Sequence, residues 1–231
     1  MLIMIQNDPE VPPGIFGDFL REEGISFTLV HPCAGDPLPL PAEVTAAIVL
    51  GGAMGVRDTE KHPFLETVKT FIGGCVAAGR PYLGICLGGQ LLADVLGAPV
   101  TSGADGEKGT LPVDLTVEGE RDPLFAGIPR RFITFQWHDD TFAVPAGGVL
   151  LASSAVCPRQ AFRVGDRAWG LQFHPEVNRE IVDTWARWSG DTAPDAESFL
   201  AAFAAAETEY RAASRLMLGN FLVAAGMKRA R

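Results

Sequence analysis

The sequence predicts an α/β fold, with a mostly parallel central sheet flanked by helices and a smaller set of antiparallel strands. Short apolar segments alternate with helical segments over residues 2–97, which is typical of a parallel sheet with both faces covered. Polar alternation replaces this pattern over residues 110–173, which indicates strands of an antiparallel set. The 231 residues, 47% of them apolar, are enough for one large domain with a sizeable core.

The first half of the chain supplies the expected parallel core. Apolar or strand-like runs at four places predict strands: residues 2–5, 26–30, 46–50 and 81–85. Three segments predict helices, each closed by a glycine: residues 14–23, 63–78 and 88–96. The proline-rich segment at residues 32–41 predicts a loop, because proline fits neither ladder nor helix interiors.

The second half predicts further strands and two helices. The strand-like segments are residues 110–117, 131–136, 149–153, 160–164 and 168–173, expected as antiparallel strands beside or across the parallel core. Residues 178–188 and 196–225 return to helical periodicity. In the last segment one stripe is assigned to core packing rather than to a cofactor contact: Phe199, Phe203, Tyr210, Leu216 and Phe221. No linker interrupts the chain, so residues 1–231 are expected to form a single domain.

Charge and composition exclude several classes of protein. The formal net charge is −9, which argues against binding to a nucleic-acid backbone, and the basic segment 227–231 is expected to be a solvated tail. No run of about 18 apolar residues predicts a membrane span. The first residues lack the basic region of a signal peptide, so a cytoplasmic location is expected.

The four cysteines do not form a recognisable metal or disulfide pattern. They lie at positions 33, 75, 86 and 157, and no pair has the Cys-x-x-Cys spacing of a zinc ribbon or a thioredoxin-type site. We therefore predict no metal site and no cofactor. Cys33, Cys75 and Cys157 are interpreted as buried structural cysteines, because a free cysteine usually behaves as a small apolar residue.

Cys86 is different, because it lies where a predicted buried strand gives way to a helix. Residues 84–88 (GICLG) are the cysteine counterpart of the Gly-x-Ser-x-Gly nucleophile elbow. Glycines permit such a sharp turn, and the following helix N-terminus offers N–H groups and partial positive charge that favour a thiolate. A nucleophile is favoured over a buried structural cysteine at this position.

A cysteine nucleophile needs a base, and the base needs an orienting acceptor. His174 and Glu176 are separated by Pro175, which favours an extended chain in which both side chains point to the same side. The three residues Cys86, His174 and Glu176 are therefore the predicted triad. His31 and His62 are interpreted as surface residues, whereas His138 is left as a competing base, a wall of the substrate site or a polar loop residue.

A glycine-rich turn follows the predicted strand at residues 46–50. Residues 51–55 (GGAMG) match neither a dinucleotide fingerprint nor a P-loop. Two interpretations remain for the turn: its backbone N–H groups stabilise an oxyanion beside a nucleophile, or the glycines serve only the tight turn itself.

Together these segments resemble the class I (triad) glutamine amidotransferase family. The resemblance rests on the turn at 51–55, on residues 84–90 (GICLGGQ) and on residues 174–176 (HPE), in the order cysteine, histidine, glutamate. It spans residues 46–176 and implies the α/β fold of that family. The combination of the three motifs is far more specific than any of them alone.

The resemblance implies hydrolysis of the glutamine side-chain amide through a γ-glutamyl thioester, with release of ammonia and then of glutamate. By position, Cys86 is the nucleophile, His174 the general acid and base, and Glu176 the residue that orients the histidine. Backbone N–H groups near Gly52 and of Leu87 would form the oxyanion hole. The substrate contact falls to Gln90, and the segment with Trp137 and His138 is similar to one beside the active site of stand-alone members.

Three functions therefore stay open. The leading prediction is a glutaminase-type amidotransferase, similar to the glutaminase domain of GMP synthase, that delivers ammonia to an unknown acceptor. Residues 177–231 are too short for a synthetase domain, so the acceptor site is expected on a separate protein, if there is one. The alternatives are a γ-glutamyl peptidase or hydrolase that cleaves a small γ-glutamyl compound, and a non-catalytic interaction subunit.

Overall fold

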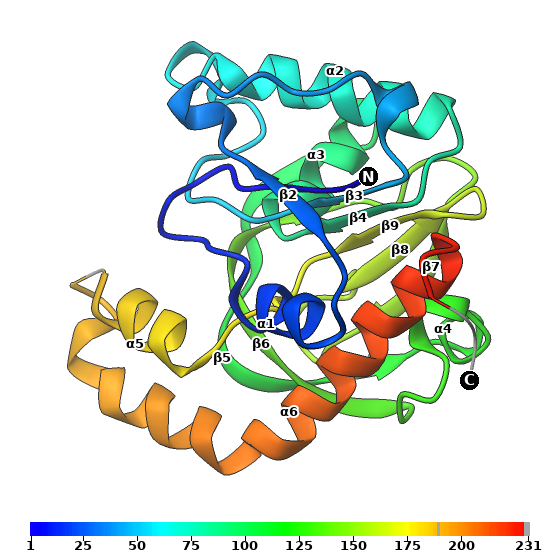
Figure 1. Ribbon diagram of the computed structural model, residues 1–231. Helices are drawn as coiled ribbons and strands as arrows, with labels where there is room; N and C mark the ends of the chain where they lie inside the picture. Colours follow the sequence, from blue (N-terminus) through cyan, green and yellow to red (C-terminus); the bar gives the residue numbers. More distant parts are fainter. Residues whose placement is uncertain (189, 229–231) are drawn as a thin grey trace.

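The computed structural model describes residues 1–188 and 190–228, and in this part of the chain nine strands form one sheet (Figure 1). The strand order is β2-β1-β3-β4-β9-β8-β7-β5-β6. Five strands form the parallel part: β2 (Phe27–Val30), β1 (Leu2–Ile5), β3 (Ala46–Val49), β4 (Tyr82–Ile85) and β9 (Ala168–Leu171). The antiparallel part adds β8 (Ala161–Val164), β7 (Val149–Ser153), β5 (Val100–Leu115) and β6 (Arg131–Phe142). The predicted mixed α/β architecture is confirmed.

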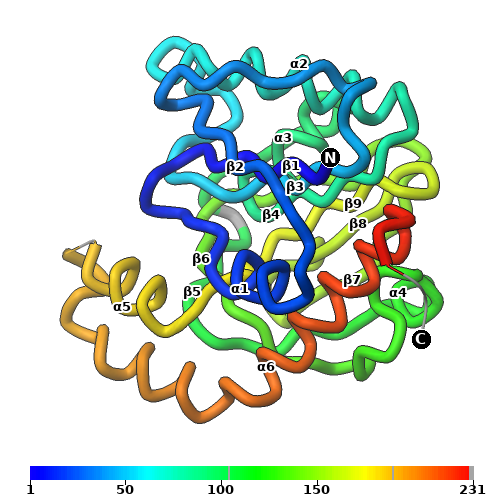
Figure 2. The backbone as a smooth tube through the Cα atoms, in the orientation of Figure 1, coloured from blue at the N-terminus to red at the C-terminus, as the bar shows by residue number. Residues whose placement is uncertain are grey.

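Helices cover both faces of the sheet. They are α1 (Gly14–Glu22), α2 (Phe64–Ala77), α3 (Leu87–Val95), α4 (Val117–Glu120), α5 (Arg179–Trp188) and α6 (Ala196–Ala224). Along β1, Leu2 and Met4 pack in one apolar cluster with α1 and α6, while Ile3 and Ile5 pack in a second cluster with α2 and α3. Figure 2 traces the chain from β1, inside the sheet, to the red end of α6 on the outside. Burial on both faces explains why these strands are apolar throughout.

Strand β9 joins the two parts of the sheet, which corrects one prediction. Residues 168–173 were expected among the antiparallel strands, but β9 runs parallel to β4, with Gly170 opposite Gly84. Its other edge pairs antiparallel with β8. Side-chain alternation could not distinguish these cases, because pairing direction depends on which strand arrives at each edge.

Strands β5 and β6 are longer than predicted, and the longer β6 includes Trp137 and His138. β5 begins at Val100 rather than near residue 110, and β6 continues to Phe142 rather than ending near residue 136. An irregularity between Ser102 and Glu107 breaks the register, and charged residues in that segment conceal the strand pattern. Trp137 and His138 consequently lie within β6 and not in a loop.

Two further residues differ from their predicted surroundings. In α6, Phe203, Tyr210 and Phe221 are buried in the core as expected, but Leu216 is 42% exposed because it lies off the buried face of the helix. Cys33 is exposed rather than buried, in a 3₁₀ turn that follows β2. Cys75 and Cys157 are buried as expected.

The last described residue is tied to the residue that follows α1. Lys228, from the predicted basic tail, forms an ion pair of 2.9 Å with Glu23, while the rest of that tail, residues 229–231, lies outside the described residues. Within the described chain, no helix combines the length and the apolar character that crossing a bilayer requires.

Candidate active site

The three predicted catalytic residues follow neighbouring elements at one edge of the sheet. Cys86 follows β4 directly, and His174 comes three residues after the end of β9, the strand that pairs with β4. Gly51 follows β3, which pairs with β4 on its other edge. The carboxyl ends of adjacent parallel strands meet at one edge, which is where open α/β sheets bind ligands.

The backbone at Cys86 has the strained turn that the elbow motif predicts. Its φ of 49° and ψ of −108° make it the one non-glycine residue with positive φ in the described part of the chain. The residue is the N-cap of α3, so the helix N-terminus starts beside the thiol. Strain of this kind persists only where the surrounding structure holds it in place, and it is concentrated at functional sites.

Three glycines around Cys86 explain why the turn can exist. A Cβ on Gly84 would lie 2.4 Å from the carbonyl carbon of Gly88, and a Cβ on Gly88 would lie 2.1 Å from the carbonyl oxygen of Val49. A Cβ on Gly89 would lie 2.7 Å from the carbonyl oxygen of Leu171. Each contact is with backbone, which cannot move aside cheaply, so α3 packs this closely on β3, β4 and β9 only without side chains.

His174 and Glu176 form the predicted pair. The distance between His174 Nδ1 and Glu176 Oε1 is 2.7 Å, and both side chains are almost fully buried. The backbone of His174 donates to the carbonyl of Phe135 and accepts from the hydroxyl of Tyr210. The two backbone bonds hold the residue in place, and the Glu176 carboxylate holds the ring at Nδ1. The other ring nitrogen, Nε2, is left for another partner.

The charges around His174 favour its protonated form. Burial alone would lower its pKa, but the Glu176 carboxylate and Cys86 outweigh burial and raise the pKa of His174 to about 10. The protonated imidazole and the N-terminus of α3 therefore both place positive charge beside the sulfur of Cys86.

Gly51 shows how close the histidine and the cysteine lie. A Cβ at Gly51 would be 3.0 Å from His174 Cε1 and 3.6 Å from Cys86 Cβ. Gln172, buried at the end of β9, directs its Nε2 toward the sulfur of Cys86 at 3.6 Å. The cysteine therefore has a histidine and an amide donor as its neighbours, a set that can activate a thiol nucleophile.

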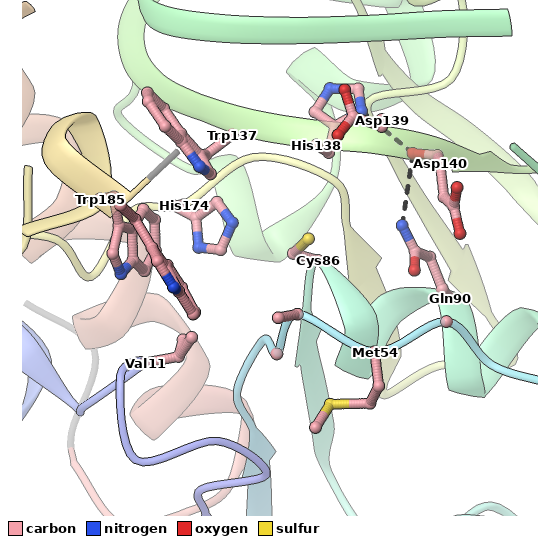
Figure 3. A pocket seen from close by; sticks show the side chains of 14 residues that line it. Val11, Met54, Cys86, Gln90, Trp137, His138, Asp139, Asp140, His174 and Trp185 are labelled. Atoms are coloured by element: carbon pink, nitrogen blue, oxygen red, sulfur yellow. Dashed lines mark hydrogen bonds between the residues drawn. The ribbon is translucent and has the colours of Figure 1, made fainter. Parts of the chain in front are cut away.

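A cavity of about 440 Å³ opens over Cys86 and His174 (Figure 3). Its size is typical of small-molecule sites. Four of the predicted substrate-binding residues line it: Gly52, Gln90, Trp137 and His138. The fifth, Leu87, has a fully buried side chain that packs beneath the glycine turn, where a Cβ on Gly52 would lie 3.0 Å from Leu87 Cδ2.

Gln90 and His138 converge on one backbone carbonyl. Gln90 Nε2 donates to the carbonyl oxygen of Asp140 at 3.3 Å, and His138 Nδ1 lies 3.0 Å from the same oxygen (Figure 3). Burial lowers the pKa of His138 to about 4, despite the opposing effect of this hydrogen bond. Of the three interpretations of His138, the loop is wrong, and its position favours a wall of the cavity.

Sequence reasoning missed several residues of the site. Asp140 and Trp185 line the cavity, and the ring of Trp185 packs edge-on against His174 with centroids 4.7 Å apart. Gln172 was also missed. Gln172 follows β9 directly and lies two residues before His174; in an extended chain residues two apart point to one side, and this signal could have identified it. No local signal marks Trp185, which reaches the site from α5.

Comparison with known proteins agrees with this geometry. The family described as glutamine amidotransferase class-I matches residues 20–184. The glutamine amidotransferase-like protein YfeJ of Salmonella typhimurium is 32% identical over 188 residues, which cover 80% of this chain and 79% of YfeJ. One subunit of the glutamine-hydrolyzing GMP synthase of Methanoculleus marisnigri is 35% identical over 146 residues, 61% of this chain and 72% of the relative. Against a full GMP synthase, that of Aeropyrum pernix, the match spans 32% of the relative's length.

Solved structures show the same fold along the whole chain. A glutamine amidotransferase from Thermotoga maritima superposes with a TM-score of 0.86 at 32% identity, with 98% of both chains covered. One from Methylobacillus flagellatus gives 0.85 at 28% identity, with all of this chain and 96% of the other covered. The family match, the sequence relatives and the structural neighbours agree, and the chain belongs to the class I glutamine amidotransferase family.

Proposed function

We propose that this chain hydrolyses the side-chain amide of glutamine through a thioester on Cys86, and that it does so as a single domain. The observation that carries the proposal is the buried His174–Glu176 pair beside a cysteine held at positive φ on a helix N-terminus. This arrangement supplies a nucleophile and a proton carrier that line one cavity, and a fully buried carboxylate that is hydrogen-bonded to the proton carrier.

In the first half of the reaction, the sulfur of Cys86 attacks the amide carbon and a tetrahedral oxyanion forms. We assign its stabilisation to backbone N–H groups near Gly52 and of Leu87. In support, Gly52 lines the cavity and Leu87 begins α3, where N–H groups lack intrahelical acceptors. His174 gives its proton to the leaving nitrogen, the carbon–nitrogen bond breaks, and ammonia departs. The acyl group then remains on sulfur as a γ-glutamyl thioester.

In the second half, His174 takes a proton from water, which attacks the thioester carbon. The carbon–sulfur bond breaks, glutamate leaves, and the cysteine returns to its starting state. Glu176 keeps the imidazole oriented through its hydrogen bond to Nδ1 throughout. Gln90 is proposed to contact the glutamine substrate; its position in the wall of the cavity supports this role.

A γ-glutamyl peptidase or hydrolase activity is the second candidate, and one observation favours it. Three tryptophans line the cavity: Trp137, Trp185 and Trp188. Trp188 is half-exposed, so an apolar wall extends from the catalytic pair to the rim of the cavity. A leaving group larger and less polar than ammonia would bury surface against this wall.

One assay distinguishes these activities. Purified protein is given glutamine or a γ-glutamyl dipeptide in parallel, and release of ammonia, glutamate and the free amino acid is followed, with Cys86→Ala as control. Preference for glutamine supports the amidotransferase, which would then deliver ammonia to a separate synthetase protein. Preference for the dipeptide supports the hydrolase. If both substrates fail, labelling of Cys86 by a glutamine-like electrophile separates a silent enzyme from a non-catalytic interaction protein.

A further inference from the structure

We propose that Glu107, His138 and Cys157 form a binding site for a divalent cation of the zinc type, behind the wall of the catalytic cavity. One ligand atom from each side chain lies within 4.8 Å of the other two, and all three residues are buried. These residues are separate from the proposed catalytic triad. Their distant positions in the sequence explain why cysteine spacing gave no sign of a metal site.

The sheet brings the three residues together. Glu107 and His138 are direct partners in the antiparallel pairing of β5 and β6, immediately after the irregularity in β5. Cys157 comes from the segment between β7 and β8, where its sulfur lies 3.3 Å from Thr141 Oγ1. The site is therefore held by a sheet ladder on one side and by a hydrogen-bonded turn on the other.

The hydrogen bond of His138 determines which nitrogen is available to a metal. Its Nδ1 lies 3.0 Å from the carbonyl oxygen of Asp140, and a carbonyl can only accept. In neutral imidazole, Nδ1 is then the donor and Nε2 carries the lone pair. Metal-binding histidines typically hold their other nitrogen in this way, with the N–H on a backbone carbonyl.

The lone pair on His138 Nε2 has no hydrogen-bond donor in the described part of the chain, although the side chain is only 1% exposed. The nearest carboxylate oxygen, Glu107 Oε2, is 3.9 Å away and is itself an acceptor. Two acceptors therefore face each other in a buried place, where an unpaired polar group is costly. A cation between them would give Nε2 the partner it lacks and would offset the negative charge of Glu107, whose Oε2 already accepts two hydrogen bonds.

The other groups nearby leave this arrangement short of positive charge. Glu107 Oε2 accepts from Ser154 Oγ and from Gln160 Nε2, each at 2.6 Å, and both donors are neutral. Arg159 pairs with Asp105 at 3.0 Å, and Lys108 pairs with Asp139 at 3.2 Å. Neither basic side chain pairs with Glu107. A bound cation would compensate the negative charge of this carboxylate.

The donor set indicates which ion fits. Sulfur, imidazole nitrogen and carboxylate oxygen together suit Zn²⁺, whereas magnesium and calcium take oxygen ligands. Zinc bonds of about 2.0–2.2 Å to nitrogen and oxygen put tetrahedral ligands about 3.4 Å apart, so the 3.9 Å separation must close by roughly half an ångström. The cysteine would bind as thiolate and release its proton to solvent.

A bound ion would also act on the cavity. It would fix His138, and through the Asp140 carbonyl it would hold the backbone to which Gln90 donates. The site would then stabilise one wall of the cavity through His138, which lines it. We accordingly assign it a positioning role, while the bond-breaking steps remain with the proposed triad.

The test is metal binding by the full chain after treatment with a chelator. Zn²⁺ stoichiometry is measured by elemental analysis, and Co²⁺ is substituted to detect a thiolate ligand by its charge-transfer absorption. Wild type and Cys86→Ser are each expected to bind one tightly held ion per chain. Cys157→Ser and Glu107→Gln are expected to bind more than about 100-fold more weakly, since loss of an outer-shell partner alone costs 10–100-fold.

Two control variants separate the site from other thiols. Cys75→Ser removes another buried cysteine and Cys33→Ser removes the exposed one, and both should bind as wild type does. In wild type, Zn²⁺ should raise the unfolding temperature, and this shift should vanish in Cys157→Ser. Binding by Cys157→Ser and Glu107→Gln at wild-type affinity, loss of the ion in Cys86→Ser, or no binding by wild type would each overturn the proposal.

Discussion

Two buried clusters in this protein contain the same three kinds of side chain and differ in almost everything else. In one, His174 and Glu176 are hydrogen-bonded at 2.7 Å and the pKa of the histidine is raised to about 10. In the other, His138 and Glu107 are 3.9 Å apart and the pKa of the histidine is lowered to about 4. The difference shows that residue type alone does not define a triad.

The cysteines differ in the same way. Cys86 is at the strained start of a helix and lines the cavity, whereas Cys157 is fully buried and burial raises its pKa. One histidine is therefore suited to carry protons beside a nucleophile, and the other presents a fixed lone pair to a closed site. The geometry between the partners, and not their residue types, is the basis for proposing covalent chemistry at one cluster and cation binding at the other.

The largest expected effect separates Cys86 from the other thiols. Cys86→Ala should lower glutamine or γ-glutamyl turnover by at least about 10⁴-fold, because the nucleophile is lost and no neighbouring group replaces it. Circular dichroism should show an unchanged fold. Cys75→Ala, which removes a buried thiol in α2, is the matched control and should keep wild-type turnover. Substantial activity in Cys86→Ala would show that Cys86 is not the nucleophile, and the contrast between it and the other cysteines would then fail.

The next effect ranks the histidine above its carboxylate. His174→Ala should reduce kcat nearly as much as loss of the nucleophile does. The reduction of kcat in Glu176→Ala should be about 10- to 100-fold smaller than that in His174→Ala, because Glu176 only orients the base. Steady-state kinetics of both variants at neutral pH provide the measurement. Equal and complete loss in both would mean that Glu176 does more than orient the imidazole.

A third prediction concerns the packing that holds Cys86 in its turn. Gly88→Ala should destabilise the fold by about 1–3 kcal/mol or more, because the new Cβ would lie 2.1 Å from the backbone oxygen of Val49. Gly219→Ala is the control, since a Cβ there meets nothing within 4 Å in α6. That change should stabilise by about 0.5–1 kcal/mol. Urea denaturation of both variants measures the difference, and equal stabilities would disprove the close packing.

The last prediction is a pH dependence of stability that comes from His174. Its pKa is raised from 6.5 to about 10 in the folded state, so the fold holds the proton more tightly than the unfolded chain. This stabilising contribution is complete below pH 6.5 and is lost as the pH rises toward 10. The free energy of unfolding of wild type minus that of Glu176→Gln should therefore shrink over this interval. A constant difference would show that Glu176 does not control the charge of His174.

Much of the site could be predicted because its signals are local. The elbow around Cys86 requires glycines at fixed offsets, and the pair His174 and Glu176 needs only an extended chain across Pro175. These constraints act within a few residues, so they remain visible in the sequence. Trp185 and the partnership of Glu107 with His138 could not be predicted, because α5 and the β5–β6 register bring them into place.

The sequence by itself determined the family, the alternation of strands and helices, and the residues proposed for the reaction, since each depends on short-range spacing and side-chain chemistry. Only the tertiary structure decided that β9 joins the parallel and antiparallel parts, that Cys33 is exposed, and that His138 belongs to a strand. Only it placed Cys157 beside Glu107 and His138. The physical reason is that strand order, burial and the partners of a buried lone pair are set by contacts between segments far apart in the chain.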